Sequence, residues 1–130
     1  MEQSKAKLVR FKQMDVMNIA SVVELRNHIY AKLGQIDILI NNAGVYYHPT
    51  NNNEEHFVQV QKTLATNYWG LKNVVNAFLP MLADNARIVN MSSNLSDVNL
   101  VSNLELRKKF GKEAISGDFF SNYLIFFSQS

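Results

Sequence analysis

The sequence predicts an α/β protein built on a parallel sheet, and three observations support this class. An apolar run, Ile36–Ile40, leads directly into Asn41-Asn42-Ala43-Gly44, as at the end of a buried parallel strand. A helical pattern precedes this run and a longer one follows it. A second run of branched residues, 87–93, then ends in two serines. Strands that alternate with helices indicate βαβ units, which bind ligands at the carboxyl edge of their sheet.

The first predicted strand spans residues 8–14, where apolar and polar side chains alternate, and it ends at Asp15. Asn18 is a suitable N-cap for the helix that follows, and Gly34 supplies its C-terminal stop. Apolar residues recur at helical spacing between these two positions. Residues 8–41 thus form one predicted βαβ unit.

The second half of the predicted sheet begins after a loop, residues 45–53, which contains Pro49 and three consecutive Asn. A long helix is predicted from about residue 54 to 82, with Pro80 near its end as the point of a kink. The connection is long enough for a right-handed crossover. Strands 36–41 and 87–93 should therefore be parallel neighbours.

The C-terminal part carries weaker patterns. Residues 94–103 are loop-like, and 104–114 predict a short helix. Seven of the nine residues 119–127 are aromatic or aliphatic, which is typical of an aggregation-prone segment or of a terminal core strand.

Composition excludes several functional classes. The chain of 130 residues is sized for one domain, and its net charge is only +2. The basic group Arg107–Lys109 is interpreted as a solvated helix face rather than a nucleic-acid site. The chain has no Cys, and its three His are too widely spaced for a helical pair, so no metal is expected. Without a signal peptide or an apolar membrane span, we expect a cytoplasmic protein.

Five segments together resemble the short-chain dehydrogenase/reductase superfamily, and within it the monomeric NADPH-dependent carbonyl reductases. They are Phe11–Val16, Asp37–Val45, Thr66–Gly70, Arg87–Ser93 and Glu105–Phe110. The resemblance implies a partial Rossmann-like, doubly wound parallel sheet with strands 3, 4 and 5 of the family order and their helices. It assigns residues 1–118 to this domain and leaves 119–130 as an apolar tail unlike the family.

The resemblance also implies an NADP site. Asp15, with the backbone of Val16, would meet the adenine ring. Asn42, Ala43 and Gly44 would line the ribose and the nicotinamide, while the Asn41 amide would tie adjacent strands together. Taken alone, Asp15 is equally explained as a turn residue at a strand end.

The resemblance also implies catalytic residues, which lie in the long helix and at the end of the strand that comes after it. Ser93 would donate a hydrogen bond to the oxygen of a small carbonyl substrate, where negative charge accumulates. Asn67 would hold a water of the proton relay through its backbone, in a locally distorted helix. Tyr47, His48 and Gln59 are candidates for the substrate rim. Without the resemblance, Ser93 would be interpreted as a cap or turn residue. Asn67 would be interpreted as an exposed residue on the helix surface.

Two family motifs are missing from their expected places: the glycine-rich Thr-Gly-x-x-x-Gly-x-Gly turn does not occur, and no Tyr-x-x-x-Lys pair follows the serine strand. Tyr68 and Lys72 have the spacing of that pair but precede the serine strand. Tyr123 follows the serine, but Phe127 stands where the lysine is required. We therefore expect a truncated, catalytically incompetent form of an enzyme that transfers hydride from NADPH to a ketone, aldehyde or quinone.

In the order 3-2-1-4-5-6, two strands are missing between the one that ends at Asp15 and strand 36–41. The first strand must then pair elsewhere, stay unpaired or be replaced by the tail. Open apolar edges favour self-association. One alternative function is a non-catalytic partner that pairs with a full-length reductase. Another is a small flavodoxin-like nucleotide binder, although no phosphate-binding glycine loop is present.

Overall fold

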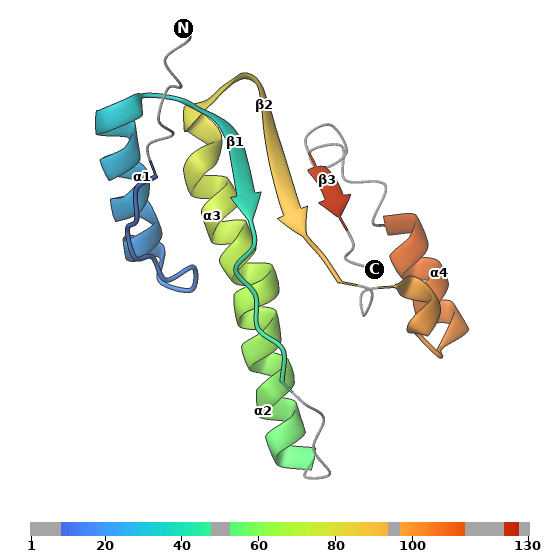
Figure 1. Ribbon diagram of the computed structural model, residues 1–130. Coiled ribbons are helices and arrows are strands. Elements are labelled where there is room, and N and C mark those ends of the chain that lie inside the picture. The colour runs from blue at the N-terminus through green and yellow to red at the C-terminus, as the bar shows by residue number, and fades with distance from the viewer. Residues whose placement is uncertain (1–8, 48–52, 94–96, 114–123, 128–130) are drawn as a thin grey trace, which may run out of the picture.

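A computed structural model describes residues 9–47, 53–93, 97–113 and 124–127. They form a parallel three-stranded sheet in the order β1-β2-β3, with helices α1 and α3 side by side on one face of β1 (Figure 1). The strands are β1 (Ile36–Asn41), β2 (Leu82–Met91) and β3 (Leu124–Phe127). The α-helices are α1 (Ile19–Leu33), α2 (Asn53–Leu64), α3 (Leu71–Phe78) and α4 (Leu104–Glu113). The α/β class is confirmed.

Helix α1 begins and ends where its caps predict. The side-chain oxygen of Asn18 accepts hydrogen bonds from the backbone N–H groups of Ala20 and Ser21, at 3.0 and 3.3 Å. Gly34 follows the last turn with a φ of +75°, a conformation that glycine adopts without a Cβ clash. Both predicted ends of this helix are confirmed.

The predicted parallel pair of strands is also confirmed. The regular register between β1 and β2 runs from Ile38 opposite Arg87 to Asn41 opposite Asn90. Strand β2 begins at Leu82, five residues earlier than predicted. The additional residues include an irregular stretch before Arg87, in which Asn85 has a φ of 66° and the register with β1 shifts. It ends at Met91, so the two serines follow the strand.

The long predicted helix consists of several segments. Helix α2 is followed by a π-helical turn, Ala65–Gly70, then by α3 and a 3-10 turn, Leu79–Met81. Pro80 lies in this last turn, where the helix ends. A π turn inserts an extra residue into a helix and frequently occurs at functional sites.

The hydrophobic core lies between the helices and the sheet. Val22 of α1 and Val74 and Phe78 of α3 are buried together with Met81. Ile36 and Leu39 of β1 pack against this cluster from the sheet, as do further partly buried apolar residues of the N-terminal segment and α1. Each fully buried apolar side chain contributes about 1.5–3 kcal/mol. This core fixes β1 relative to α1 and α3.

The predicted first strand is wrong for its described part, because residues 9–14 form no strand. The segment runs alongside α1, to which Lys12 is joined by an ion pair with Glu24 at 2.9 Å (Figure 1). A strand needs a neighbour to satisfy its backbone groups, and no described strand lies beside this segment. Its side chains at Val9 and Phe11 are 88% and 94% exposed.

The described part of the tail, residues 124–127, does not replace that first strand. Strand β3 pairs in parallel with β2 on the edge opposite β1, from Ile88 opposite Leu124 to Met91 opposite Phe127. Its interpretation as a terminal strand is thus confirmed for these four residues. The predicted domain limit at residue 118 lies outside the described residues.

The C-terminal helix prediction is confirmed by α4, and a 3-10 turn, Val98–Leu100, interrupts the predicted loop before it.

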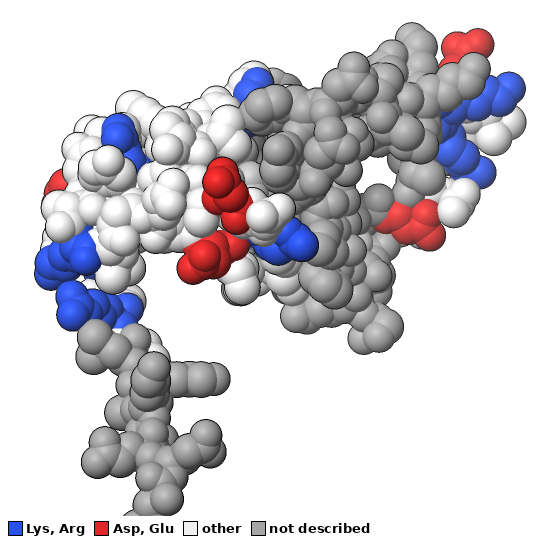
Figure 2. All heavy atoms as spheres, turned by 90° about the horizontal axis from the view of Figure 1, so that it is seen from above, with Lys and Arg blue, Asp and Glu red and all other residues white. Residues whose placement is uncertain are grey.

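On the face seen in Figure 2, Lys and Arg lie in separate small groups with Asp and Glu among them. No continuous basic surface is visible on this face.

Candidate functional site

The candidate site lies at the carboxyl edge of the sheet, where β1 and β2 end together. Asn41 is opposite Asn90, so the residues that follow the two strands leave the sheet at the same edge. Asn42, Ala43 and Gly44 are exposed there. Ser93, two residues beyond β2, is exposed as well. The fold thus directs the predicted cofactor-binding residues that follow β1 and the predicted catalytic serine to one edge.

The two strands are tied together by their side chains at this edge. The Asn41 amide donates a hydrogen bond of 2.7 Å to the side-chain oxygen of Asn90, which is only 4% exposed. A buried amide needs such a partner, because leaving it unpaired costs about 1–3 kcal/mol. The predicted structural role of Asn41 is confirmed.

The segment after β1 is held by Asn67 of the π turn. The Asn67 side-chain oxygen accepts from the backbone N–H of Val45 at 2.8 Å, and its amide donates to the Val45 carbonyl at 2.9 Å. A Cβ added at Gly44 would lie 3.4 Å from the Asn67 oxygen, a tight contact. The predicted local distortion of the helix is confirmed, whereas this side-chain role was not predicted.

The turn that carries Asp15 and Val16 approaches the same helix. The Asp15 carboxylate accepts from the Met17 N–H at 2.9 Å, and the Val16 carbonyl accepts from the Asn73 amide at 3.2 Å. A Cβ at the buried Gly70 would lie 2.7 Å from a methyl carbon of Val16, so only glycine permits this approach. Gly70 and Asn73 are positioning residues that the sequence analysis did not identify. A glycine inside a helical pattern was the available signal for one of them.

The two described rim residues lie within α2 or face it. Tyr47 is exposed and faces the Lys62 ammonium at 6.0 Å from its ring centroid. Gln59 is half-buried in α2, and its backbone carbonyl accepts a hydrogen bond from the Thr63 hydroxyl at 2.8 Å. His48 lies outside the described residues.

The Tyr68 and Lys72 pair has no catalytic geometry. The Lys72 ammonium lies over ring faces, 5.9 Å from the Tyr68 centroid and 5.2 Å from that of Trp69. These are cation–π contacts on the helix surface, where the ring rather than the phenol oxygen faces the cation. Tyr123 lies outside the described residues.

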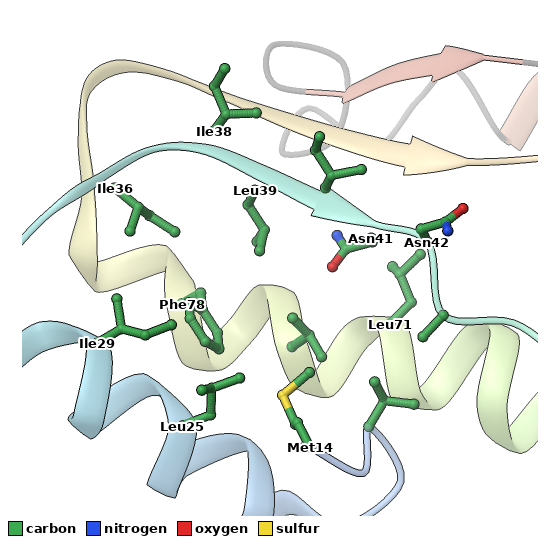
Figure 3. A pocket seen from close by; sticks show the side chains of 14 residues that line it. Met14, Leu25, Ile29, Ile36, Ile38, Leu39, Asn41, Asn42, Leu71 and Phe78 are labelled. Carbon is green, nitrogen blue, oxygen red and sulfur yellow. The ribbon is translucent and has the colours of Figure 1, made fainter. Parts of the chain in front are cut away.

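A hollow of about 260 Å³ opens beside β1 (Figure 3). In Figure 3, Leu25 and Ile29 enter it from α1, Phe78 from α3, and Leu39 from β1. Met14 and Val16 of the N-terminal segment also line it. Its lining contains no charged residue, and Asn41 and Asn42 are its polar members. The hollow thus lies between the N-terminal segment and β1, where the family order would place two further strands.

Two further properties concern the described residues only. They contain no group of three or more His, Asp or Glu that could hold a metal ion. Among their helices, none combines the length and the apolar character that a membrane crossing requires.

The neighbouring parallel strands β1 and β2 are followed by Asn42-Ala43-Gly44 and by Ser92-Ser93, and the π turn that carries Asn67 lies between the two strands in sequence. Residues 1–104 match the family model described as short chain dehydrogenase, and the chain belongs to this family. The chain is 35% identical to carbonyl reductase [NADPH] 1 of Mus musculus over 109 residues, and 34% identical to that of Homo sapiens over 108. Each match covers 82% of this chain and 39% of the relative, so the chain spans less than half of these proteins.

Solved structures support the same fold. Salutaridine reductase from Papaver somniferum superposes with a TM-score of 0.66 at 27% identity, covering 80% of this chain and 46% of that one. ElxO with NADP bound superposes with a TM-score of 0.58 at 31% identity, covering 65% of this chain and 35% of that one. The partial coverage of both proteins agrees with a sheet that contains only part of the doubly wound order.

Proposed function

We propose that these residues are the central part of a carbonyl reductase whose parent reaction reduces a ketone, aldehyde or quinone with NADPH. The observation that carries the proposal is the shared edge of β1 and β2, with Asn42–Gly44 and Ser93 leaving the sheet together. The similarity to carbonyl reductases [NADPH] supports the choice of carbonyl substrate and cofactor. We further propose a cytoplasmic location, in line with the family.

The residues present fit a dinucleotide at this edge. Asn42, Ala43 and Gly44 are exposed, and Gly44 carries no Cβ that would crowd the Asn67 side chain. One oxygen of the Asp15 carboxylate accepts from Met17, which leaves the other able to accept from an adenine amine. Asp15 and Val16 would therefore bind the adenine end, and Asn42–Gly44 the nicotinamide end.

The proposed chemistry of this chain rests on Ser93. NADPH, when bound, supplies the hydride. The Ser93 hydroxyl would donate a hydrogen bond to the substrate oxygen, which gains negative charge during the reaction. The Asn67 backbone would hold a water for the proton relay, and its side chain keeps the segment after Gly44 in place. No Tyr-x-x-x-Lys pair follows Ser93 in these 130 residues to supply the proton.

A chimera tests the proposal. In mouse carbonyl reductase [NADPH] 1, the segment that matches this chain is replaced by this chain's own residues. We expect NADPH-dependent reduction of a quinone such as menadione, lowered about 100-fold or more by Ser93→Ala, because removal of one positioned donor typically has that effect. Ser92→Ala is the matched control and should retain activity. A folded chimera that is inactive, or equal loss in both variants, would contradict the proposed role.

The isolated chain of 130 residues provides the second arm of this test. We propose that it is catalytically incompetent, because it contains neither the glycine-rich phosphate-binding turn nor a Tyr-x-x-x-Lys pair after Ser93. Incubated with NADPH and a quinone, it should show no turnover above buffer. Turnover that disappears in Ser93→Ala would contradict this part of the proposal.

A second candidate function is a non-catalytic partner of a full-length reductase. Ile38 and Ile40 favour it, since both are 60% exposed on β1, and Figure 3 shows Ile38 directed away from the helices. Co-purification of a reductase with the tagged chain, lost when residues 119–130 are deleted, would support this function. A chain that purifies only with itself would contradict it.

A further inference from the structure

The turn before α1 is held by one side of the helix that runs from the π turn into α3. Thr66, Gly70 and Asn73 follow one another at intervals of four and three residues, the spacing of helix neighbours. The Thr66 hydroxyl donates to the sulfur of Met17 at 3.3 Å. The Asn73 amide donates to the carbonyl of Val16 at 3.2 Å. Gly70 lies between these two donors in sequence and leaves room for the Val16 side chain.

The peptide group between Val16 and Met17 is fixed at both ends. Its N–H, which belongs to Met17, donates to the Asp15 carboxylate at 2.9 Å. Its carbonyl, which belongs to Val16, accepts from the half-buried Asn73 amide. Because a peptide group is planar and rigid, a rotation at its carbonyl also turns its N–H. Asn73 therefore helps to orient the Asp15 carboxylate without contacting it.

The other backbone groups of Asp15 are also paired. Its N–H donates to the Ser21 hydroxyl at 3.0 Å, and its carbonyl accepts from the Asn18 N–H at 3.1 Å. Two groups of the turn have no hydrogen-bond partner within the residues that the structure describes: the second carboxylate oxygen of Asp15 and the N–H of Val16. One is an acceptor and the other is a donor.

An acceptor beside a donor distinguishes adenine from hypoxanthine. The amino group at position 6 of adenine donates, and the neighbouring ring nitrogen N1 accepts. In hypoxanthine the 6-oxo group accepts and the N1–H donates, so both contacts would be mismatched. A site that pairs with a polar group strongly rejects an analogue that lacks it. The preference for adenine therefore depends on how firmly the turn orients these two groups.

We propose that Asn73 is a positioning residue that sets how strongly the site prefers adenine to hypoxanthine in the dinucleotide. The inference rests on the proposed function, in which Asp15 and Val16 bind the adenine end of NADPH. Asn73 acts through the Val16–Met17 peptide and does not touch the base. Without its amide the turn must be ordered when the dinucleotide binds, and that ordering lowers affinity.

Amide hydrogen exchange in the 130-residue chain tests the link from Asn73 to the peptide. We expect the Met17 N–H to exchange about two- to tenfold faster in Asn73→Ala, because the loss of one hydrogen bond has an effect of this size. Asn76→Ala, at an exposed position of the same helix, is the matched control and should leave this rate unchanged. The Val22 N–H of α1 is the internal reference. Equal acceleration at Met17 and Val22, or none at Met17, would overturn the link.

Cofactor kinetics of the chimera with mouse carbonyl reductase test the link from the turn to the base. The two probes are NADPH and its analogue with hypoxanthine in place of adenine. In Asn73→Ala we expect the KM for NADPH to rise about two- to tenfold, while kcat and the KM for the analogue stay unchanged. Asn76→Ala should alter neither KM. An equal rise for both dinucleotides, or a change in kcat alone, would overturn the positioning role.

Binding measurements separate this inference from the proposed function. A folded chimera that binds NADPH without reducing a quinone would contradict the proposed reaction only, and dissociation constants of both dinucleotides then replace KM in the comparison. The same preference for NADPH in the parent chimera and in Asn73→Ala would overturn the role of Asn73 and leave the proposed function standing. A folded chimera that binds neither dinucleotide would overturn both.

Discussion

Asn67 binds the backbone of Val45 through both ends of its side-chain amide, at 2.8 and 2.9 Å. The side-chain amide pairs with the N–H and the C=O of Val45, as the backbone of a neighbouring strand would. Because Asn67 belongs to the π turn Ala65–Gly70, the distortion of the helix is coupled to the backbone position of the segment that follows β1. A change in the helix is therefore expected to alter the site, although the two are 22 residues apart in sequence.

Replacing Asn67 by Ala should lower the free energy of unfolding by about 1 kcal/mol, because two partly solvated hydrogen bonds are lost. Urea unfolding measures this change through its midpoint. Asn76→Ala is the matched control, since Asn76 is an exposed residue of α3 and gains the same helix propensity. Equal midpoints in the two variants would contradict a structural role for the Asn67 side chain.

Gly70→Ala should destabilise the chain by about 1–3 kcal/mol, because the new Cβ would lie 2.7 Å from a Val16 methyl carbon. Val16→Ala in the same chain removes that methyl and should recover part of the loss. A double-mutant cycle by urea unfolding measures the coupling. Additive effects of the two substitutions would show that Val16 and Gly70 are not in contact.

Asn41→Leu should cost about 1–3 kcal/mol, because the side-chain oxygen of the buried Asn90 loses its donor. In the double variant Asn41→Leu/Asn90→Leu both polar partners are gone, and most of the loss should be recovered. Asn42→Leu, at the exposed neighbouring position, serves as the control and should leave the unfolding midpoint almost unchanged. A double variant less stable than Asn41→Leu would contradict the pairing.

His28 on the surface of α1 makes the stability of the chain depend on pH. The pKa of His28 is lowered from its ordinary value, chiefly by the charge of Lys32, with loss of hydration and the charges of Lys12 and Arg10 adding to the effect and Glu24 opposing it. Because the folded pKa is depressed, the folded chain binds this proton less readily than the unfolded chain. This contribution to stability is therefore fully present above the ordinary value of 6.5, and it is lost as pH falls from 6.5 through the lower pKa of the folded chain.

Lys32→Gln should raise the His28 pKa, and proton NMR of the imidazole ring measures the titration directly. Lys72→Gln is the control, because Lys72 lies over the aromatic rings of Tyr68 and Trp69 and is not among the causes of the shift. An unchanged or lower His28 pKa in Lys32→Gln would contradict the assignment of Lys32 as the main cause.

Local signals predicted much of this fold. The caps at Asn18 and Gly34, the apolar strand before Asn41 and the helical spacing before Pro80 act over a few residues, so their structure could be derived from sequence. The parallel pairing of β1 and β2 followed from the length of their connection. The resemblance to reductases, carried by short motifs at the strand ends, pointed to the same edge.

The sequence by itself therefore determined the helices, the adjacent parallel strands β1 and β2, and the family to which the chain belongs. Only the tertiary structure decided that residues 9–14 stay unpaired, that β3 joins the far edge of β2, and that Asn67 and Gly70 position the backbone around the site. The reason is physical. Periodicity and capping depend on adjacent residues, whereas strand pairing and close contacts such as Gly70 with Val16 depend on which neighbours the completed fold provides.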